Sequence, residues 1–223
     1  LAFKDESGKL QGLEIELAQR LARDLLGKPE EAVDIVDLVK LKPVSNLQRL
    51  KLVTEGEVDM AIAKVTATAS RERIVNFSVP YYFDGGVIAT QDTSIQKLND
   101  LQNSRIALLK NSSTIAPIKY YLPKAKLVGV ESYLEGQRLI ENNKVTAFAA
   151  DITSLNNWVK QNPQYRLLPT KISTQPLSVV MPKGLQYDEL RRQVSKLIAS
   201  YLEKGWLKQR TQYWGLPEGL YQS

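Results

Sequence analysis

The stretch 56–82, GEVDMAIAKVTATASRERIVNFSVPYY, joins an apolar run to a polar segment. Its first part, EVDMAIAKV at 57–65, is apolar enough to form a buried strand. Thr66, Thr68 and two arginines follow directly. Because ligands of open α/β sheets bind beyond the carboxyl ends of strands, polar side chains at this place indicate a binding site.

The remainder of the chain alternates helical and strand patterns. LEIELAQRLARDLL at 13–26 places its leucines on one helical stripe, and Gly27 follows as a stop signal. Ser132 and Glu135 fit a capping box. The alternation indicates an α/β fold with mostly parallel sheets. The other expected elements are a helix over NLQRLKLVTEG (46–56), strands at RIALL (105–109), KLVGV (126–130), VTAFAAD (145–151) and PLSVVMP (176–182), and helices beginning near Ser112, Ser132, Ile152 and Tyr187.

Composition argues against several classes of function. The 223 residues carry a net charge of +6 and include no histidine and no cysteine. The missing histidine removes the commonest general base and metal ligand, and the missing cysteine removes disulfides, thiolate catalysis and cysteine zinc sites. We therefore expect no catalytic residue, no metal and no cofactor. The basic residues are scattered rather than gathered beside stacking aromatics, so we expect no nucleic-acid partner.

Length and hydropathy set further bounds. A chain of 223 residues can bury a sizeable core in one domain or two. No run of about 18 apolar residues is present, so the sequence predicts no segment that spans a bilayer. The chain opens without a charged, apolar and small-residue cleavage pattern, so we expect any signal peptide to have been removed or never present.

The chain contains one internal echo. LVTEGEVDMAIAK at 52–64 matches LIENNKVTAFAAD at 139–151 in pattern, with helix end over helix end, turn over turn and strand over strand. Two interpretations are open: helix-turn-strand units share core and turn requirements, or the chain holds two similarly built lobes. In the second, Lys64 and Asp151 end equivalent strands and project into one cleft.

The stretch 56–82 resembles the signature of bacterial periplasmic amino-acid-binding proteins, the solute receptors of ABC importers. In that family a Gly-x-x-Asp strand precedes Thr-x-Thr-Pro-x-Arg and Phe-Ser-x-Pro-Tyr-Tyr, and here Ala69 replaces the first proline. Counting back from Phe77 selects Arg71, rather than Arg73, as the family's ligand arginine. The residues in step are Gly56, Asp59, Thr66, Thr68, Arg71, Phe77, Ser78, Pro80, Tyr81 and Tyr82.

Segments along nearly the whole chain are similar to the same family, from DESGKLQGLEIELAQRLA near the start to LEKGWLKQRTQYWG near the end. VTAFAAD resembles the strand that carries the family's ammonium-binding aspartate. The resemblance implies a two-lobed periplasmic binding protein-like fold with a two-strand hinge at VIATQD and QPLSVVMP. Lobe 1 would comprise 1–89 and 177–223, lobe 2 would comprise 90–176, and the lobes would close around the ligand.

The family resemblance also assigns ligand contacts. A free amino acid presents a carboxylate and an ammonium on one carbon, so the resemblance implies that Arg71 binds the carboxylate as a bidentate fork and Asp151 takes the ammonium. Besides Ala69, three residues depart from the family pattern: Lys64 replaces a small residue, Asn111 a glycine, and Gln175 a frequent glutamate. The implied ligand-binding residues are Lys64, Thr66, Thr68, Arg71, Ser112, Ser113, Asp151 and Gln175.

The same side chains have structural interpretations. Judged alone, Arg71 is typical of a solvated surface arginine and Asp151 of an N-cap for ITSLNNWV. Lys64 alone would be a solvated strand-end lysine, and Tyr81 and Tyr82 favour packing over ligand contact. The ordered family spacing is what favours ligand roles for Arg71 and Asp151.

The resemblance therefore predicts binding of a free amino acid by a periplasmic or extracytoplasmic monomer that delivers it to an ABC permease, and no enzyme activity. If the Lys64 ammonium enters the cleft, it pairs with an anionic or amide ligand side chain, so we rank glutamate, aspartate and glutamine above lysine and arginine. The alternatives are the ligand-binding sensory domain of an ion channel or kinase receptor and, less expected, a dehydratase or lyase on the same fold.

Overall fold

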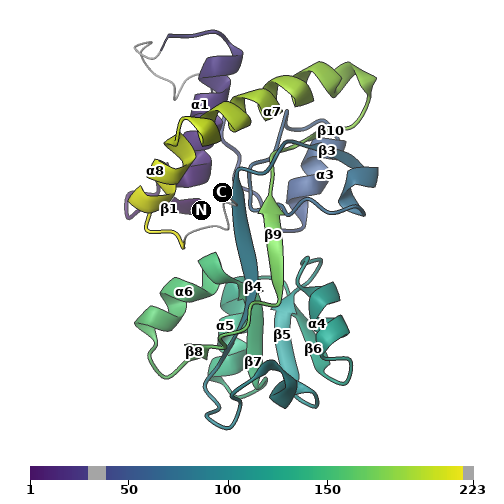
Figure 1. Ribbon diagram of the computed structural model, residues 1–223, viewed down its shortest axis with the longest axis vertical. Helices are drawn as coiled ribbons and strands as arrows, with labels where there is room; N and C mark the ends of the chain where they lie inside the picture. The colour runs from purple at the N-terminus through teal and green to yellow at the C-terminus, as the bar shows by residue number, and fades with distance from the viewer. Residues whose placement is uncertain (30–38, 218–223) are drawn as a thin grey trace. The chain divides into compact units, whose positions relative to one another are not determined.

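A computed structural model describes residues 1–29 and 39–217 of the chain. The chain divides into two compact units, unit 1 with Leu1–Tyr82 and Pro176–Ser223, and unit 2 with Phe83–Gln175. Two paired strands, β4 (Tyr82–Thr90) and β9 (Ser173–Leu177), carry the chain across the boundaries (Figure 1). In the part of the chain that is described, no helix combines the length and apolar character needed to cross a membrane.

The boundaries differ in part from those expected from the sequence. The first crossing falls between Tyr82 and Phe83, rather than after residue 89 in VIATQD, and the second falls between Gln175 and Pro176, against an expected 176/177. The first difference has a simple cause: residues 86–90 of β4 are already paired with a strand of unit 2, so VIATQD begins inside that unit.

Unit 1 is built around helices α1 (Leu13–Leu25) and α7 (Asp188–Glu203), which pack against each other. The leucine stripe at 13, 17 and 21 is at most 1% exposed and lies in one apolar cluster with Tyr81, Met181 and Ile198. Strands β3 (Val75–Phe77) and β10 (Val180–Pro182) pair antiparallel. The remaining elements of unit 1 are β1 (Phe3–Lys4), β2 (Leu10–Gln11), α3 (Gln48–Thr54), η1 (Arg71–Arg73), η3 (Leu185–Tyr187) and α8 (Trp206–Tyr213).

Unit 2 contains one mixed sheet in the order β6-β5-β7-β4-β8. Strand β5 is parallel to β6 and β7, whereas β4 runs antiparallel to β7 and β8. The parallel part is therefore the β6-β5-β7 half, where helices connect the strands. The elements are β5 (Arg105–Leu109), β6 (Lys126–Val130), β7 (Ala147–Asp151), β8 (Arg166–Leu167), η2 (Leu98–Leu101), α4 (Ile115–Tyr121), α5 (Tyr133–Glu141) and α6 (Ile152–Gln161).

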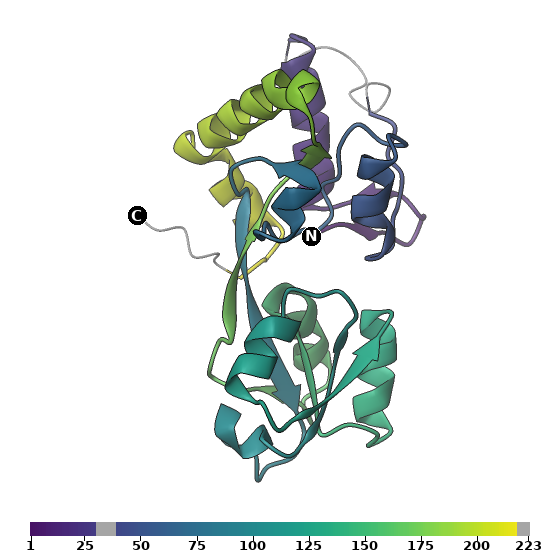
Figure 2. The same cartoon turned by 90° about the vertical axis from the view of Figure 1, so that its right-hand side faces the viewer.

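Helices cover both faces of this sheet (Figure 2). Alternating strand residues face opposite sides: Ala107 and Leu109 lie in a cluster with α5 and α6, whereas Ile106 and Leu108 lie in a cluster with α4 and η2. A sheet buried on both faces explains why these strands read as continuous apolar runs. The α/β class expected from the sequence is confirmed.

Several predicted elements are confirmed in place. The helix expected at 13–26 is α1, and the strands expected at 105–109 and 126–130 are β5 and β6. Ser132 caps α5, since its Oγ accepts the N–H of Glu135 at 3.1 Å. The Glu135 carboxylate reaches the N–H of Glu131, at 2.7 Å, so the reciprocal bond of the box is shifted by one residue.

Two predicted strands are corrected. Among the described residues, 57–65 forms a single antiparallel bridge, Ala61 with Val180, because Lys64 turns into the left-handed region and its peptide group bonds to side chains. The strand expected at PLSVVMP is divided in two: β9 ends at Leu177, and β10 begins at Val180.

The internal echo is present at the helix ends. Gly56 and Asn143, which occupy matching positions, have φ values of 71° and 54°. In both copies the next N–H returns to the carbonyl five residues earlier, at 2.9 and 2.8 Å, which is a Schellman closure. The following segments differ, because only the second copy forms a full strand, β7. Shared turn chemistry accounts for the common part under either interpretation.

Candidate functional site

In unit 1, the candidate residues lie on the segment 63–71, which follows the Ala61 bridge. Lys64 has φ 51°, a left-handed conformation that is uncommon for residues other than glycine. Its N–H donates to Oε1 of Glu14 at 2.7 Å, and its carbonyl accepts Nη1 of Arg49 at 2.7 Å. The position where the family usually has a small residue is thus a position of special backbone geometry.

Glu14 is a buried carboxylate at the start of α1, with 3% of its surface exposed. Its Oε1 also accepts the hydroxyl of Tyr81 at 2.6 Å. Burial, reinforced by the neighbouring Glu14 carboxylate, raises the pKa of Tyr81 well above its usual value, so the hydroxyl stays a donor. Tyr81 and Tyr82 are both fully buried, which agrees with the packing interpretation.

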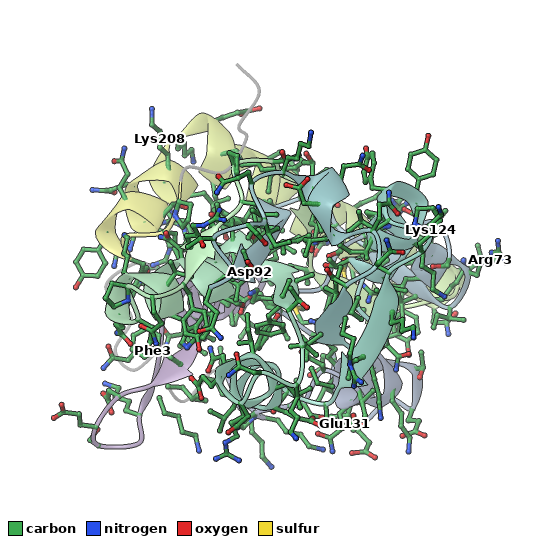
Figure 3. All side chains as sticks on the ribbon, turned by 90° about the horizontal axis from the view of Figure 1, so that it is seen from below. Phe3, Arg73, Asp92, Lys124, Glu131 and Lys208 are labelled. Atoms are coloured by element: carbon green, nitrogen blue, oxygen red, sulfur yellow. The ribbon has the colours of Figure 1, made fainter. Side chains whose placement is uncertain are left out.

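Thr66, Thr68 and Arg71 form one hydrogen-bonded turn. Thr66 is 5% exposed and forms a bridge with Leu177, and its carbonyl accepts Nη1 of Arg71 at 2.9 Å. The Arg71 N–H donates to Oγ1 of Thr68 at 3.4 Å. Arg71 is half-buried at the first position of η1, whereas Arg73 is exposed and projects outward at the edge of the view in Figure 3.

In unit 2, three candidate residues gather beyond the carboxyl end of β5. Gln175 is 2% exposed; its Oε1 accepts the hydroxyl of Ser113 at 3.2 Å, and its Nε2 donates to Oγ1 of Thr114 at 3.2 Å. Ser112 accepts the N–H of Thr114 at 3.1 Å through its hydroxyl. Asn111, just before, has φ 58°, which explains why glycine suits this place and why asparagine is tolerated.

Asp151 ends β7 and stands at the N-cap position of α6. Its side chain makes no capping hydrogen bond; its Oδ2 accepts the hydroxyl of Tyr133 at 2.7 Å. The helix is capped instead by Asp84, which is 2% exposed and accepts both the N–H of Thr153, at 3.4 Å, and its hydroxyl. Asp84 also accepts the N–H of Gly85 at 2.8 Å. Asp151 is thus the N-cap residue of α6, as the sequence indicated, but its side chain does not make the capping bond.

The candidate residues are brought together within each unit. Lys64, Thr66, Thr68 and Arg71 share one segment of unit 1. Strands β5 and β7 are parallel neighbours, so the residues that follow β5 and the end of β7 lie at the same edge of the unit 2 sheet. Among residues 1–29 and 39–217, no group of three or more histidine, cysteine, aspartate or glutamate side chains could hold a metal ion.

Most of the side chains that hold these segments were not predicted from the sequence. They are Glu14, Arg49, Asp84, Thr114 and Tyr133, whereas Tyr81 was predicted as a packing residue. For Glu14 the sequence did contain a signal. It lies three residues before Leu17 and seven before Leu21, so this charged residue falls on the apolar stripe of its helix. For Asp84 no local signal exists, since its partner Thr153 is 69 residues away.

Two α/β units joined by paired strands, one with polar side chains on the segment 63–71 and the other with polar side chains beyond strand ends, define a two-lobed α/β solute-binding protein. Residues 1–217 match the family of bacterial extracellular solute-binding proteins, family 3, and the chain belongs to that family. The resemblance noted in the sequence is confirmed, and the family is one of solute-binding proteins rather than enzymes.

Individual relatives are similar at moderate identity. A glutamine-binding protein of Geobacillus stearothermophilus is 28% identical over 176 residues, which cover 78% of this chain and 64% of the relative. This chain therefore spans less than two thirds of that relative's length. The solute receptor for L-cysteine of Neisseria gonorrhoeae has a TM-score of 0.83 at 25% identity, covering 96% of this chain and 84% of the receptor. An ancestral arginine-binding protein bound to glutamine has a TM-score of 0.80 at 26% identity, covering 96% and 91%.

Proposed function

We propose that this protein binds a free amino acid with residues of both units, outside the cytoplasm, and delivers it as a monomer to an ABC permease. The observation that supports this most directly is a pair of opposite charges, one in each unit, each held by a hydrogen bond. Unit 1 holds a guanidinium, Arg71, fixed by the Thr66 carbonyl, and unit 2 holds a carboxylate, Asp151, fixed by the Tyr133 hydroxyl.

These two groups complement the two charges that every free amino acid carries. The planar guanidinium offers donors in the geometry of a carboxylate, and its bond to Thr66 limits the rotation of the fork. Asp151 has oxygens that can accept an ammonium, and it is not engaged in capping α6. Thr68 supplies a hydroxyl next to Arg71, and Ser112 and Ser113 supply hydroxyls at the edge of the unit 2 sheet where β7 ends with Asp151.

For the ligand side chain we propose an acidic or amide group. Lys64 carries an ammonium on the same segment as Arg71, so a second anion or an amide oxygen is favoured over a cation. Gln175, buried and bonded to Ser113, contributes an amide at the unit 2 sheet edge. A relative named as a glutamine-binding protein fits this class of ligand.

The test is titration calorimetry with a panel of the common L-amino acids. Glutamine, glutamate and aspartate should bind, and lysine and arginine should bind more weakly or not at all. Asp151→Asn removes the negative charge and should weaken binding of the best ligand by at least about tenfold. Asp92→Asn is the matched control, because this exposed aspartate follows Thr90, which pairs with Ala147 at the start of β7, whereas Asp151 is at the end of β7.

Two results would contradict the proposal. One is a wild-type protein that binds no amino acid of the panel. The other is an Asp151→Asn variant that binds as tightly as the wild type, which would remove Asp151 from the site.

A further inference from the structure

The backbone at Lys64 is held from two sides by side chains that the proposed ligand contacts do not include. Glu14 accepts its N–H at 2.7 Å. Nη1 of Arg49 donates to the carbonyls of Ala63 and Lys64, at 2.9 and 2.7 Å. Both peptide groups that flank the Lys64 Cα are therefore fixed by bonds to side chains.

The Glu14 side of this arrangement is buried and tied to the core. Glu14 is 3% exposed, and the hydroxyl that it accepts belongs to Tyr81, which is 0% exposed. Both the Tyr81 hydroxyl and the Lys64 N–H donate to the same oxygen, Oε1, at 2.6 and 2.7 Å. This geometry places the carboxylate at a fixed point of the unit 1 core, so the Lys64 peptide has little room to rotate.

We propose that Glu14, Tyr81 and Arg49 form a clamp that imposes the left-handed conformation on Lys64 and thereby positions Thr66 and Arg71 for ligand. The inference rests on the proposed function in one respect, since it takes Arg71 as a ligand contact. The three clamp residues are positioning residues: they act through the backbone at 64.

The physical reason is the conformational preference of the residue. A residue with a Cβ disfavours positive φ, whereas glycine adopts it about as readily as negative φ. Without the clamp, position 64 would leave the conformation observed at φ 51°, and the segment that carries Thr66 and Arg71 would follow. Only the fraction of molecules in the competent conformation binds, so the apparent dissociation constant rises as that fraction falls.

This mechanism makes a prediction that a merely structural role does not. Lys64→Ala and Lys64→Gly both remove the lysine amine, but only glycine removes the preference against positive φ. Glu14→Gln should therefore raise the dissociation constant by about tenfold in the Lys64→Ala background and by a clearly smaller factor in the Lys64→Gly background. Calorimetry with L-glutamine and L-glutamate as probes measures the dissociation constants of these four variants, four for each probe.

A second readout needs no ligand and separates the clamp from the proposed function. While the clamp is intact the strain is present in the folded state, so Lys64→Gly should be more stable than Lys64→Ala in urea unfolding. Glu14→Gln should reduce this difference, because alanine at 64 can then relax. If the wild type binds neither probe and no other amino acid of the panel, the proposed function fails while the stability cycle still decides the clamp.

Asn143 provides the matched control. It also has a positive φ, 54°, but lies in unit 2. The stability difference between Asn143→Ala and Asn143→Gly should be the same with and without Glu14→Gln. Should Glu14→Gln fail to fold, Tyr81→Phe, which removes one donor and little volume, takes its place with the same criteria.

The clamp would be refuted if the effects of Glu14→Gln and of the residue at position 64 were additive. Equal effects of Glu14→Gln on the Lys64→Ala and Lys64→Gly backgrounds, in stability and in every measurable dissociation constant, would mean that Glu14 does not act through the conformation of residue 64.

Discussion

The arginine pair in SRER offers the sharpest test of the proposed ligand site. Arg71 is half-buried, and its Nη1 is bonded to the Thr66 carbonyl at 2.9 Å, whereas Arg73 is exposed in the same 3-10 turn. The two residues have the same chemistry and lie two positions apart. Arg71→Ala and Arg73→Ala are therefore a matched pair that differs mainly in where the side chain lies.

The magnitudes follow from the environments of the two side chains. Removing one partner of a desolvated, hydrogen-bonded charge pair costs about 2–5 kcal/mol of binding free energy. At 1.4 kcal/mol per tenfold, Arg71→Ala should raise the dissociation constant by about 30-fold to about 4,000-fold. Arg73→Ala changes an exposed charge, so its effect on binding should stay within about twofold.

Stability measurements show whether Arg71→Ala weakens binding only because it destabilises the fold. Arg71→Ala also removes the hydrogen bond to Thr66, which should lower the free energy of unfolding by only about 1 kcal/mol because the side chain is partly exposed. Calorimetric titration of the best amino acid of the panel, with urea unfolding of the same samples, separates the two effects. Equal losses of affinity in both variants, or none in Arg71→Ala, would refute the assignment of Arg71.

Two further predictions concern stability. Gly136→Ala on α5 would put a Cβ 2.5 Å from Cζ of the fully buried Phe148, so it should lower the free energy of unfolding by about 1 kcal/mol or more despite the better helix propensity of alanine. Gly129→Ala is the control and should lower the free energy of unfolding less, because its Cβ meets the flexible stem of Lys110. The reverse order would contradict the packing described. Tyr201→Phe removes the hydroxyl that donates to Asp24 at 2.7 Å. Burial opposes ionisation of Asp24, but the hydrogen bonds from Tyr201 and Arg23 outweigh it and lower its pKa. The stabilisation of the folded state by this pair is therefore present above pH about 4 and lost as pH falls through the lowered pKa of Asp24. In urea unfolding, Tyr201→Phe should lower the free energy of unfolding by about 1 kcal/mol at pH 7 and by less below pH 4. A loss that does not depend on pH would count against this pair.

Periodic patterns predicted the parts of the fold that depend on local sequence. The stripe of Leu13, Leu17 and Leu21 located α1, and the apolar runs located β5, β6 and β7, because burial on one stripe or on both faces leaves a direct mark on composition. The strand expected at 57–65 failed for a complementary reason. Its composition suits a strand, but the backbone turns at Lys64, where side chains from other segments take the peptide hydrogen bonds.

For the candidate site, the family resemblance implied the two charged residues, Arg71 and Asp151, and their ligand roles remain predictions. The residues that hold the surrounding segments in place were mostly not predicted. The residues that hold the neighbouring backbone are distant in sequence: Glu14, which bonds to Lys64, lies 50 positions from it, and Asp84, which bonds to Thr153, lies 69 positions away. Such contacts are set by tertiary packing, which a single sequence without an alignment does not display.

The capping of α6 by Asp84 has a consequence for how this protein can change. Many helices that begin at a binding residue use that residue's side chain as their own anchor, so altering the ligand chemistry also weakens the scaffold. Here the capping hydrogen bonds go to Asp84 on a different strand, and the Asp151 side chain does not cap the helix. Position 151 also has ordinary extended backbone angles, φ −69° and ψ 142°, so most residues fit there without strain. If Asp151 binds the ligand ammonium as proposed, the charge at 151 can therefore be exchanged to favour molecules without an ammonium, while unit 2 keeps its helix.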